Sequence, residues 1–330
     1  MRSPSKLRAR LLISCCVLAL VDSSALAYQE QDLKASEQVS TQLVRDVKDW
    51  ISKSGTSETK AADTSAHFAV DHSMMPGIWV LQASGSRYEI RATRPFHLVL
   101  TYLADTDAIT FRQQKYLACK QVYDQYLHDV FRDNAKSSLR GDPLKEVSAP
   151  EIFSATSSGL CREFGKLFPI PQELRDNRNQ SANNAFVFFY FHELGHISKR
   201  HRLPDATTFF SATNKAAKDR AFLEYMKRSR QQENEADEWA VNQLIEMGLQ
   251  PQHLFNLPIL GILLASTGID CATESISTHS FAITRMVNIL KTVQTSSEKK
   301  YKRELPKEMK KAINDFEVFG RKVSEKLKCG

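Results

Sequence analysis

The pentapeptide His192-Glu193-Leu194-Gly195-His196 contains two histidines four residues apart, with a glutamate directly after the first. On a helix, residues four apart share one face, so both imidazoles can reach a single ion. Glu193 then lies beside the ion, where its carboxylate can take a proton from a metal-activated water. This spacing predicts His192 and His196 as metal ligands and Glu193 as a catalytic base.

A second cluster of charge can complete such a site. Residues 233–240 are acidic and belong to a predicted helix that runs to about residue 247. Zinc enzymes usually hold the metal with three protein ligands and leave one position open for water. Glu233 and Asp237 are four residues apart, so one carboxylate can bind the metal while the other hydrogen-bonds a ligand imidazole. The alternative interpretation of the acidic stretch is a solvated helix face.

These residues carry a resemblance to a known family. Residues 233–237 read E-N-E-A-D and resemble the E-x-x-A-D element of gluzincin metallopeptidases related to HtpX and the CAAX-prenyl proteases. The resemblance implies that Glu233 is the third ligand of a Zn²⁺ ion and that Asp237 orients a ligand histidine. It covers about residues 180–292. The phage-exclusion Lit peptidases carry a similar H-E-x-x-H core and are the second choice.

A third element is similar to the T-H-P-x-x-x-x-R-I segment of the same family. Here it comprises residues 278–286, with His279 and Arg285 at the matching spacing and Ser280 in place of the proline. We expect Arg285, on a helix that begins near Ser280, to pair with a carboxylate close to the zinc, either Asp237 or Glu235. His279 is expected above the open coordination position as a further catalytic residue. The alternative is an exposed histidine in a capping loop.

The motifs together predict a zinc metalloendopeptidase, a hydrolase that acts on polypeptides and has no nucleic-acid partner. The alternative function is a catalytically silent, zinc-stabilised binding or chaperone-like module of the cell envelope. Such a module would keep the three ligands but would not need an acid at position 193. His201 follows His196 by five residues, which on a continuing helix puts it off the ligand face. We expect His201 to interact with the C-terminal end of the helix dipole rather than with the metal.

The N-terminus predicts export. Residues 2–10 carry four positive charges, residues 11–21 are apolar, and Ala25-Leu26-Ala27 has the small-x-small pattern of a cleavage site. A signal peptide over residues 1–27, cleaved after Ala27, indicates a periplasmic or secreted protein of bacterial type. The apolar stretch 257–269 is shorter than the roughly 20 residues of a spanning helix and predicts a buried core helix. No transmembrane segment is therefore expected after signal removal.

Cysteine usage agrees with an oxidising compartment. Removal of the leader leaves an even number of cysteines, which predicts disulfide bonds but leaves three pairings open among Cys119, Cys161, Cys271 and Cys329. The leader carries a net +3 of the formal +7, so the mature chain keeps about +4. Much of this excess lies between residues 299 and 311. The basic tail can make peripheral contact with an anionic membrane, although a solvated helix face is the favoured interpretation.

Few strands followed by many helices predict an α+β fold that is mostly helical. We predict strands at residues 78–81, 88–91, 96–102 and 108–111, which are rich in β-branched and aromatic residues. The family resemblance implies a zincin-like fold with a small sheet above the active-site helix. By analogy with zincins, residues 96–102 or 108–111 would form the edge strand that binds peptide.

The expected domain organisation has four parts. The signal peptide of residues 1–27 is followed by a polar arm or linker, residues 28–65, that contributes little to the core. Residues 66–292 form the metallopeptidase domain. Residues 293–330 form a basic C-terminal helix packed on it through an apolar face, expected to contain Ile313, Phe316, Phe319, Val323 and Leu327.

Overall fold

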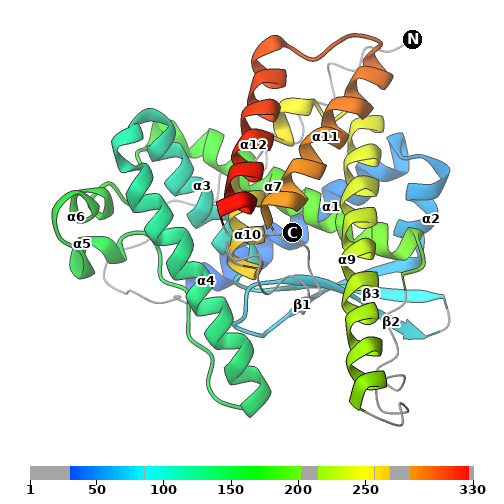
Figure 1. Ribbon diagram of the computed structural model, residues 1–330, viewed down its shortest axis with the longest axis horizontal. Coiled ribbons are helices and arrows are strands. Elements are labelled where there is room, and N and C mark those ends of the chain that lie inside the picture. Colours follow the sequence, from blue (N-terminus) through cyan, green and yellow to red (C-terminus); the bar gives the residue numbers. More distant parts are fainter. Residues whose placement is uncertain (1–29, 85, 202–214, 256, 268–281, 327–330) are drawn as a thin grey trace.

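The computed structural model describes residues 30–84, 86–201, 215–255, 257–267 and 282–326 of the 330-residue chain. Within these residues the chain is mostly helical and has one small sheet, as the sequence predicts (Figure 1). The α-helices have these bounds: α1 Glu30–Ser54, α2 Ser57–Ser65, α3 Phe96–Arg112, α4 Leu117–Arg140, α5 Ile152–Thr156, α6 Gly159–Gly165, α7 Gln172–Ser198, α9 Lys215–Glu246, α10 Leu257–Thr267, α11 Ala282–Tyr301 and α12 Lys307–Lys326.

The sheet has three strands, β1 (Ala66–Asp71), β2 (Ile78–Ser84) and β3 (Arg87–Thr93). β3 lies in the centre, parallel to β1 and antiparallel to β2. Ile90 and Ala92 of β3 are buried, in keeping with a face turned toward the core. The predicted strands at residues 78–81 and 88–91 are confirmed as parts of β2 and β3, whereas β1 was not anticipated.

The strands predicted at residues 96–102 and 108–111 are wrong, because both stretches belong to helix α3. A short apolar run does not distinguish a strand from a buried helix, and here the longer pattern decides. Buried side chains recur at helical spacing at Phe96, Val99, Leu100, Leu103 and Ala104. Neither stretch can therefore be the peptide-binding edge of the sheet, which leaves β1 and β2 as its edges among the described strands.

The segment expected to be a polar arm contributes directly to the core, so that expectation is wrong for residues 30–65. Helix α1 buries one face, whose apolar residues are Leu33, Leu43, Val44, Val47 and Ile51. Helix α2 follows, and its side chains form hydrogen bonds with residues of α7 and α9. Its Glu58 accepts hydrogen bonds from Ser198 Oγ at 2.5 Å and from Trp239 Nε1 at 2.9 Å, and Thr59 Oγ1 donates to Gln243 Oε1 at 2.6 Å.

Helix α7 runs through the middle of the molecule. Its apolar run, residues 185–191, is buried on every side, because α7 contacts α1, α2, α3, α9, α10 and β2. The predicted core helix near residue 257 is α10, in which Ile259, Leu263 and Ala265 are buried. Within the described part of the chain, no helix is both long and apolar enough to cross a membrane.

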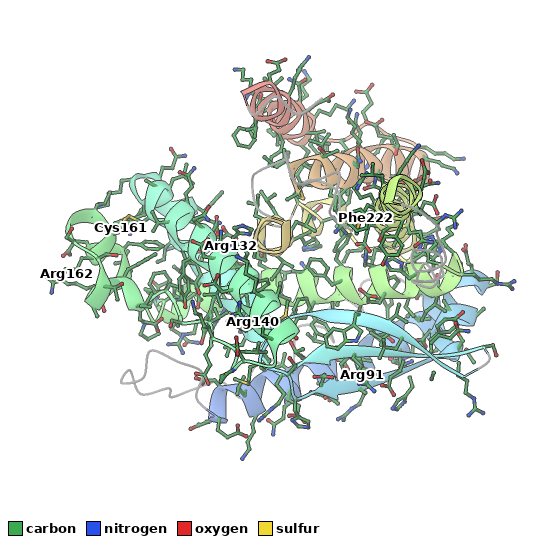
Figure 2. The ribbon with its side chains drawn as sticks, turned by 60° about the horizontal axis from the view of Figure 1, so that its bottom comes forward. Arg91, Arg132, Arg140, Cys161, Arg162 and Phe222 are labelled. Carbon is green, nitrogen blue, oxygen red and sulfur yellow. A yellow bond between two sulfur atoms is a disulfide. The ribbon has the colours of Figure 1, made fainter. Side chains whose placement is uncertain are left out.

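Helices α4, α5 and α6 form a lobe at one end of the molecule, away from α9 (Figure 1). Within this lobe, a disulfide between Cys119 and Cys161 links α4 to α6 (Figure 2). Of the three cysteine pairings left open by the sequence, this bond supports the one that joins Cys119 to Cys161. Cys271, Cys329 and the expected leader, residues 1–27, lie outside the described residues.

The C-terminal part packs as two helices rather than one. The boundary expected after residue 292 falls inside α11, where Val293 is fully buried. In α12, Ile313 is buried and Phe316 and Val323 pack on Ile283, as the amphipathic pattern predicts. Phe319 departs from that pattern because 51% of it is exposed, and Leu327 lies outside the described residues.

Candidate metal centre

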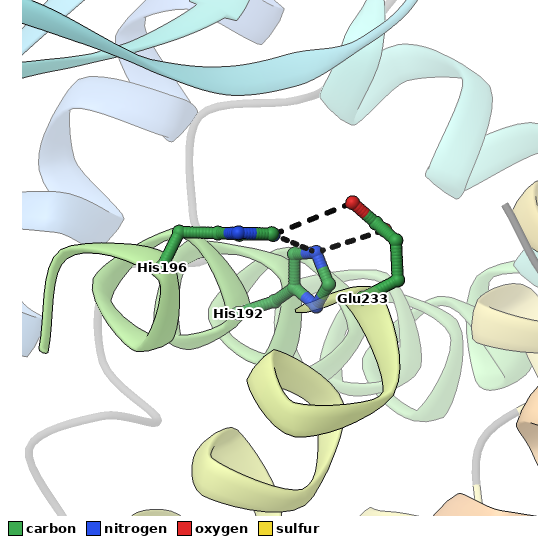
Figure 3. A group of neighbouring side chains, drawn as sticks. All are labelled: His192, His196 and Glu233. Carbon is green, nitrogen blue, oxygen red and sulfur yellow. Dashed lines mark hydrogen bonds and ion pairs between the residues drawn. The ribbon is translucent and has the colours of Figure 1, made fainter. Parts of the chain in front are cut away.

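Helices α7 and α9 bring together the three side chains that the sequence singles out as ligands (Figure 3). The Nε2 atoms of His192 and His196 lie 3.1 Å apart. Glu233 reaches over from α9, with one carboxylate oxygen 3.4 Å from the Nε2 of His192 and the other 3.4 Å from the Nε2 of His196. His192 is buried, while the side chains of His196 and Glu233 keep 14% and 13% of their surface exposed. The cluster therefore lies inside the fold but close to solvent.

The spacing of these atoms is compatible with a bound metal cation. Zinc binds imidazole nitrogen and carboxylate oxygen at about 2.0–2.1 Å, so two ligands of a tetrahedral site lie about 3.3 Å apart. The separation of 3.1 Å between the two histidine nitrogens and the contact of 3.4 Å from each of them to Glu233 are close to this edge, with the two 3.4 Å contacts made by different carboxylate oxygens. Two imidazole lone pairs that face each other at this distance also repel unless a proton or a cation lies between them. His192, His196 and Glu233 can therefore hold a metal ion.

Close packing of α7 on α9 makes this geometry possible. Gly195 lies one position before His196, and a Cβ atom there would be 3.0 Å from the carbonyl oxygen of Ala236 and 3.1 Å from its Cα. Those distances are tighter than ordinary contacts. A glycine at this point thus lets the α9 backbone approach α7, which brings Glu233 within reach of both histidines. No role for Gly195 was predicted from the sequence.

An ionic network lies behind His192. Its Nδ1 is 2.8 Å from Asp237 Oδ1, one turn after Glu233 on α9. Arg285 of α11 donates to both oxygens of Asp237, each at 2.8 Å, and its Nη1 lies 3.3 Å from Glu233. His192, Asp237 and Arg285 are all buried. The structure thus brings Arg285 to Asp237 and Glu233, and not to Glu235, the other carboxylate considered from the sequence.

The network has clear electrostatic consequences. Burial alone would lower the pKa of His192, but its contacts with Asp237 and Glu233 outweigh burial and raise that pKa to about 10. Burial and the neighbouring His192 lower the pKa of His196 below its usual value. The pKa of Asp237 is lowered: burial opposes this shift, and Arg285 and His192 overcome it. The carboxyl group of Asp237 is thus ionised, and the metal-free site favours the protonated form of His192.

His201 occupies a different place from the one expected. Its Nδ1 lies 2.9 Å from Nδ1 of His196, and its Nε2 lies 3.0 Å from Glu235. The contact could not be predicted from helical periodicity, because α7 ends at Ser198, before His201. The conformation of the residues after α7 places His201 beside His196, and that conformation has no clear signal in the sequence.

Glu193 is buried on α7 directly after His192, and it lies outside the ligand group found among the described residues. Its negative charge contributes to the raised pKa of Arg285, behind burial, which opposes the shift, and the larger effects of Asp237 and Glu233. Glu193 is therefore close to the charged centre without being one of its three ligands. His279 lies outside the described residues, so its expected position above the metal is not part of the site described here.

Comparisons with known proteins provide no family for this chain: no family model, no curated protein and no solved structure matches it.

Proposed function

We propose that this protein is an exported zinc-dependent endopeptidase, with a zincin-like fold and a relation to the HtpX and CAAX-prenyl peptidases. The proposal rests on the position of His192, His196 and Glu233, whose ligand atoms all lie within 4.8 Å of one another, with Glu193 directly after His192. Two histidines and one carboxylate are a usual ligand set of catalytic zinc, in which a fourth position stays open. The disulfide between Cys119 and Cys161 is compatible with an oxidising compartment outside the cytoplasm.

Bound zinc would supply a Lewis acid that polarises the peptide carbonyl and acidifies a water molecule. The chain supplies the proton transfers. Glu193 accepts the proton of the attacking water, whose oxygen bonds to the carbonyl carbon. Glu193 then gives that proton to the amide nitrogen as the C–N bond breaks, leaving a carboxylic acid and an amine. Burial strengthens these charge interactions because little water screens them.

The sheet provides a place for an extended polypeptide. Among the described strands β2 pairs only with β3, which makes β2 an edge strand of the sheet, and β2 contacts α7. In Figure 3 the sheet lies on the side of α7 toward which the ligand side chains point. A peptide added to an edge strand is bound mainly through its backbone, which suits a peptidase acting on varied sequences.

The test is proteolysis of casein by wild type and by Glu193→Gln, with zinc content measured on the same samples. Glutamine keeps the size of the side chain but cannot accept the proton, so cleavage should fall at least about 100-fold while zinc remains bound. Glu238→Gln is the matched control, because Glu238 is an exposed residue of α9. It should cleave casein at the wild-type rate.

Equal cleavage by wild type and Glu193→Gln would show that Glu193 is not the base. A zinc-loaded wild type that cleaves nothing would point to the silent binding module.

A further inference from the structure

We infer that His201 and Glu235 form a positioning pair that fixes His196 in its metal-binding tautomer. This inference rests on the metal centre of the proposed function. His201 Nδ1 is 2.9 Å from His196 Nδ1, and His201 Nε2 is 3.0 Å from Glu235 Oε2. Only 7% of the His201 side chain is exposed. The pair thus contacts the nitrogen of His196 that faces away from the other ligands.

The backbone after α7 builds this contact. Arg200 has a φ of 54°, the left-handed conformation, which reverses the chain direction. The N–H of Arg200 donates to the carbonyl of Ile197 at 3.0 Å, and the N–H of His201 donates to the carbonyl of His196 at 2.9 Å. These two bonds are those of a Schellman motif, in which the residue after the left-handed one returns to the last turn of the helix. In this protein the returning side chain meets the side chain of a ligand.

Hydrogen-bond chemistry then determines where the protons lie. Glu235 as a carboxylate only accepts, so it favours a proton on Nε2 of His201. Nδ1 of His201 is then an acceptor, and it favours a proton on Nδ1 of His196. His196 consequently presents the lone pair of Nε2 toward His192 and Glu233, as a metal ligand must. With the opposite tautomer, His196 would direct an N–H into the cluster and oppose metal binding.

The two ligand histidines are therefore held in different ways. His192 is fixed by Asp237, which is itself held by Arg285 deep in the protein. His196 is fixed by His201 and by Glu235, whose side chain is 42% exposed. Groups that hydrogen-bond metal ligands commonly affect metal affinity by 10- to 100-fold. His201 contacts neither the metal position nor a reacting atom, so it is a positioning residue.

The test separates the two hydrogen bonds of His201 by substitution. His201→Asn puts an amide oxygen near the position of Nδ1 and keeps the acceptor for His196. His201→Gln puts an amide near the position of Nε2 and loses that acceptor, and His201→Phe keeps a ring but loses both bonds. The zinc dissociation constant of each full-length variant is measured by competition with a chromophoric chelator. The visible spectrum of the cobalt form is recorded beside it, and unfolding of the metal-free form verifies the fold.

The expected result is zinc binding within a few-fold of wild type for His201→Asn, and about 10- to 100-fold weaker binding for His201→Gln and His201→Phe. The cobalt spectrum should change in the last two variants alone. Wild-type affinity in His201→Phe, or equal losses in all three variants, would overturn the inference. If His201→Phe does not fold, equal affinities of His201→Asn and His201→Gln overturn it instead. These measurements do not include proteolysis, so a result that overturns the role of His201 leaves the peptidase proposal intact. Conversely, a wild type that binds zinc but cleaves no protein would leave the role of His201 intact.

Discussion

At the scale of single residues, His192 is the ligand that is most strongly coupled to its surroundings. Asp237 and Glu233 both contact its ring, and they overcome burial to raise its pKa to about 10. Below the pKa of an unfolded histidine, near 6.5, this protonated His192 stabilises the metal-free fold in full. The stabilisation is lost as the pH rises through about 10. A metal ion must displace the same proton.

Zinc binding should therefore release about one proton from His192 at pH 7, and the apparent zinc affinity should rise about tenfold per pH unit between pH 6.5 and 8. Calorimetric titration of the metal-free protein in buffers with different ionisation enthalpies measures the proton count. Asp237→Asn removes the strongest partner of His192 and should reduce the number of protons released. Zinc affinity that does not change with pH would show that the metal does not bind through His192.

At the scale of elements, the site depends on how closely α9 approaches α7. Gly195→Ala places a methyl group 3.0 Å from the carbonyl oxygen of Ala236, so the two helices must separate by a few tenths of an ångström. We expect a loss of about 1–3 kcal/mol in the free energy of unfolding and weaker zinc binding. Glycine-to-alanine changes in helices normally raise the free energy of unfolding by up to about 1 kcal/mol, so a decrease here would be the opposite of the usual effect. Chemical unfolding with and without zinc provides the measurement, and increased stability with unchanged zinc affinity would contradict it.

The elements also show how far the sequence could predict the site. His192, His196, Glu233, Asp237 and Arg285 were predicted from short motifs, and the structure brings them together. The two histidines and the pair Glu233 and Asp237 could be predicted because residues four apart share a helix face whatever the rest of the fold. Arg285 was predicted only from the family resemblance. The contact of His201 with His196 depends on a left-handed residue that is not a glycine, Arg200, and such a turn has no reliable signal in a sequence.

The fold was predictable in class but not in detail. The content of helix and strand followed from local patterns, whereas residues 96–102 were misread because an apolar, aromatic run fits a strand and a buried helix equally well. The role of residues 30–65 was missed for another reason. Residues 33–51 are recognisably amphipathic, but their polar composition favoured a linker, and the partners of α1 and of Glu58 in α2 are defined only by the tertiary structure.

At the scale of the whole molecule, the disulfide stabilises a lobe that is separate from the metal centre. It closes a loop over a sequence separation of 42 residues between α4 and α6. The double substitution Cys119→Ser, Cys161→Ser should lower the free energy of unfolding by about 2–4 kcal/mol, because the unfolded chain regains the freedom of that loop. Zinc affinity should stay at the wild-type value. Urea unfolding and chelator competition measure the two quantities, and a variant that keeps its stability or loses its zinc would contradict the expectation.

We propose that α7 and α9 together hold one catalytic zinc ion. The zinc K-edge X-ray absorption spectrum of the purified protein, loaded with one equivalent of zinc, tests it most directly. We predict four nitrogen or oxygen ligands at about 2.0–2.1 Å, with the outer-sphere scattering of two imidazoles. In Glu233→Ala the same two imidazoles should remain while the zinc binds far more weakly. A spectrum with sulfur ligands, a spectrum without imidazole scattering, or zinc that dialysis removes from the wild type would contradict the claim.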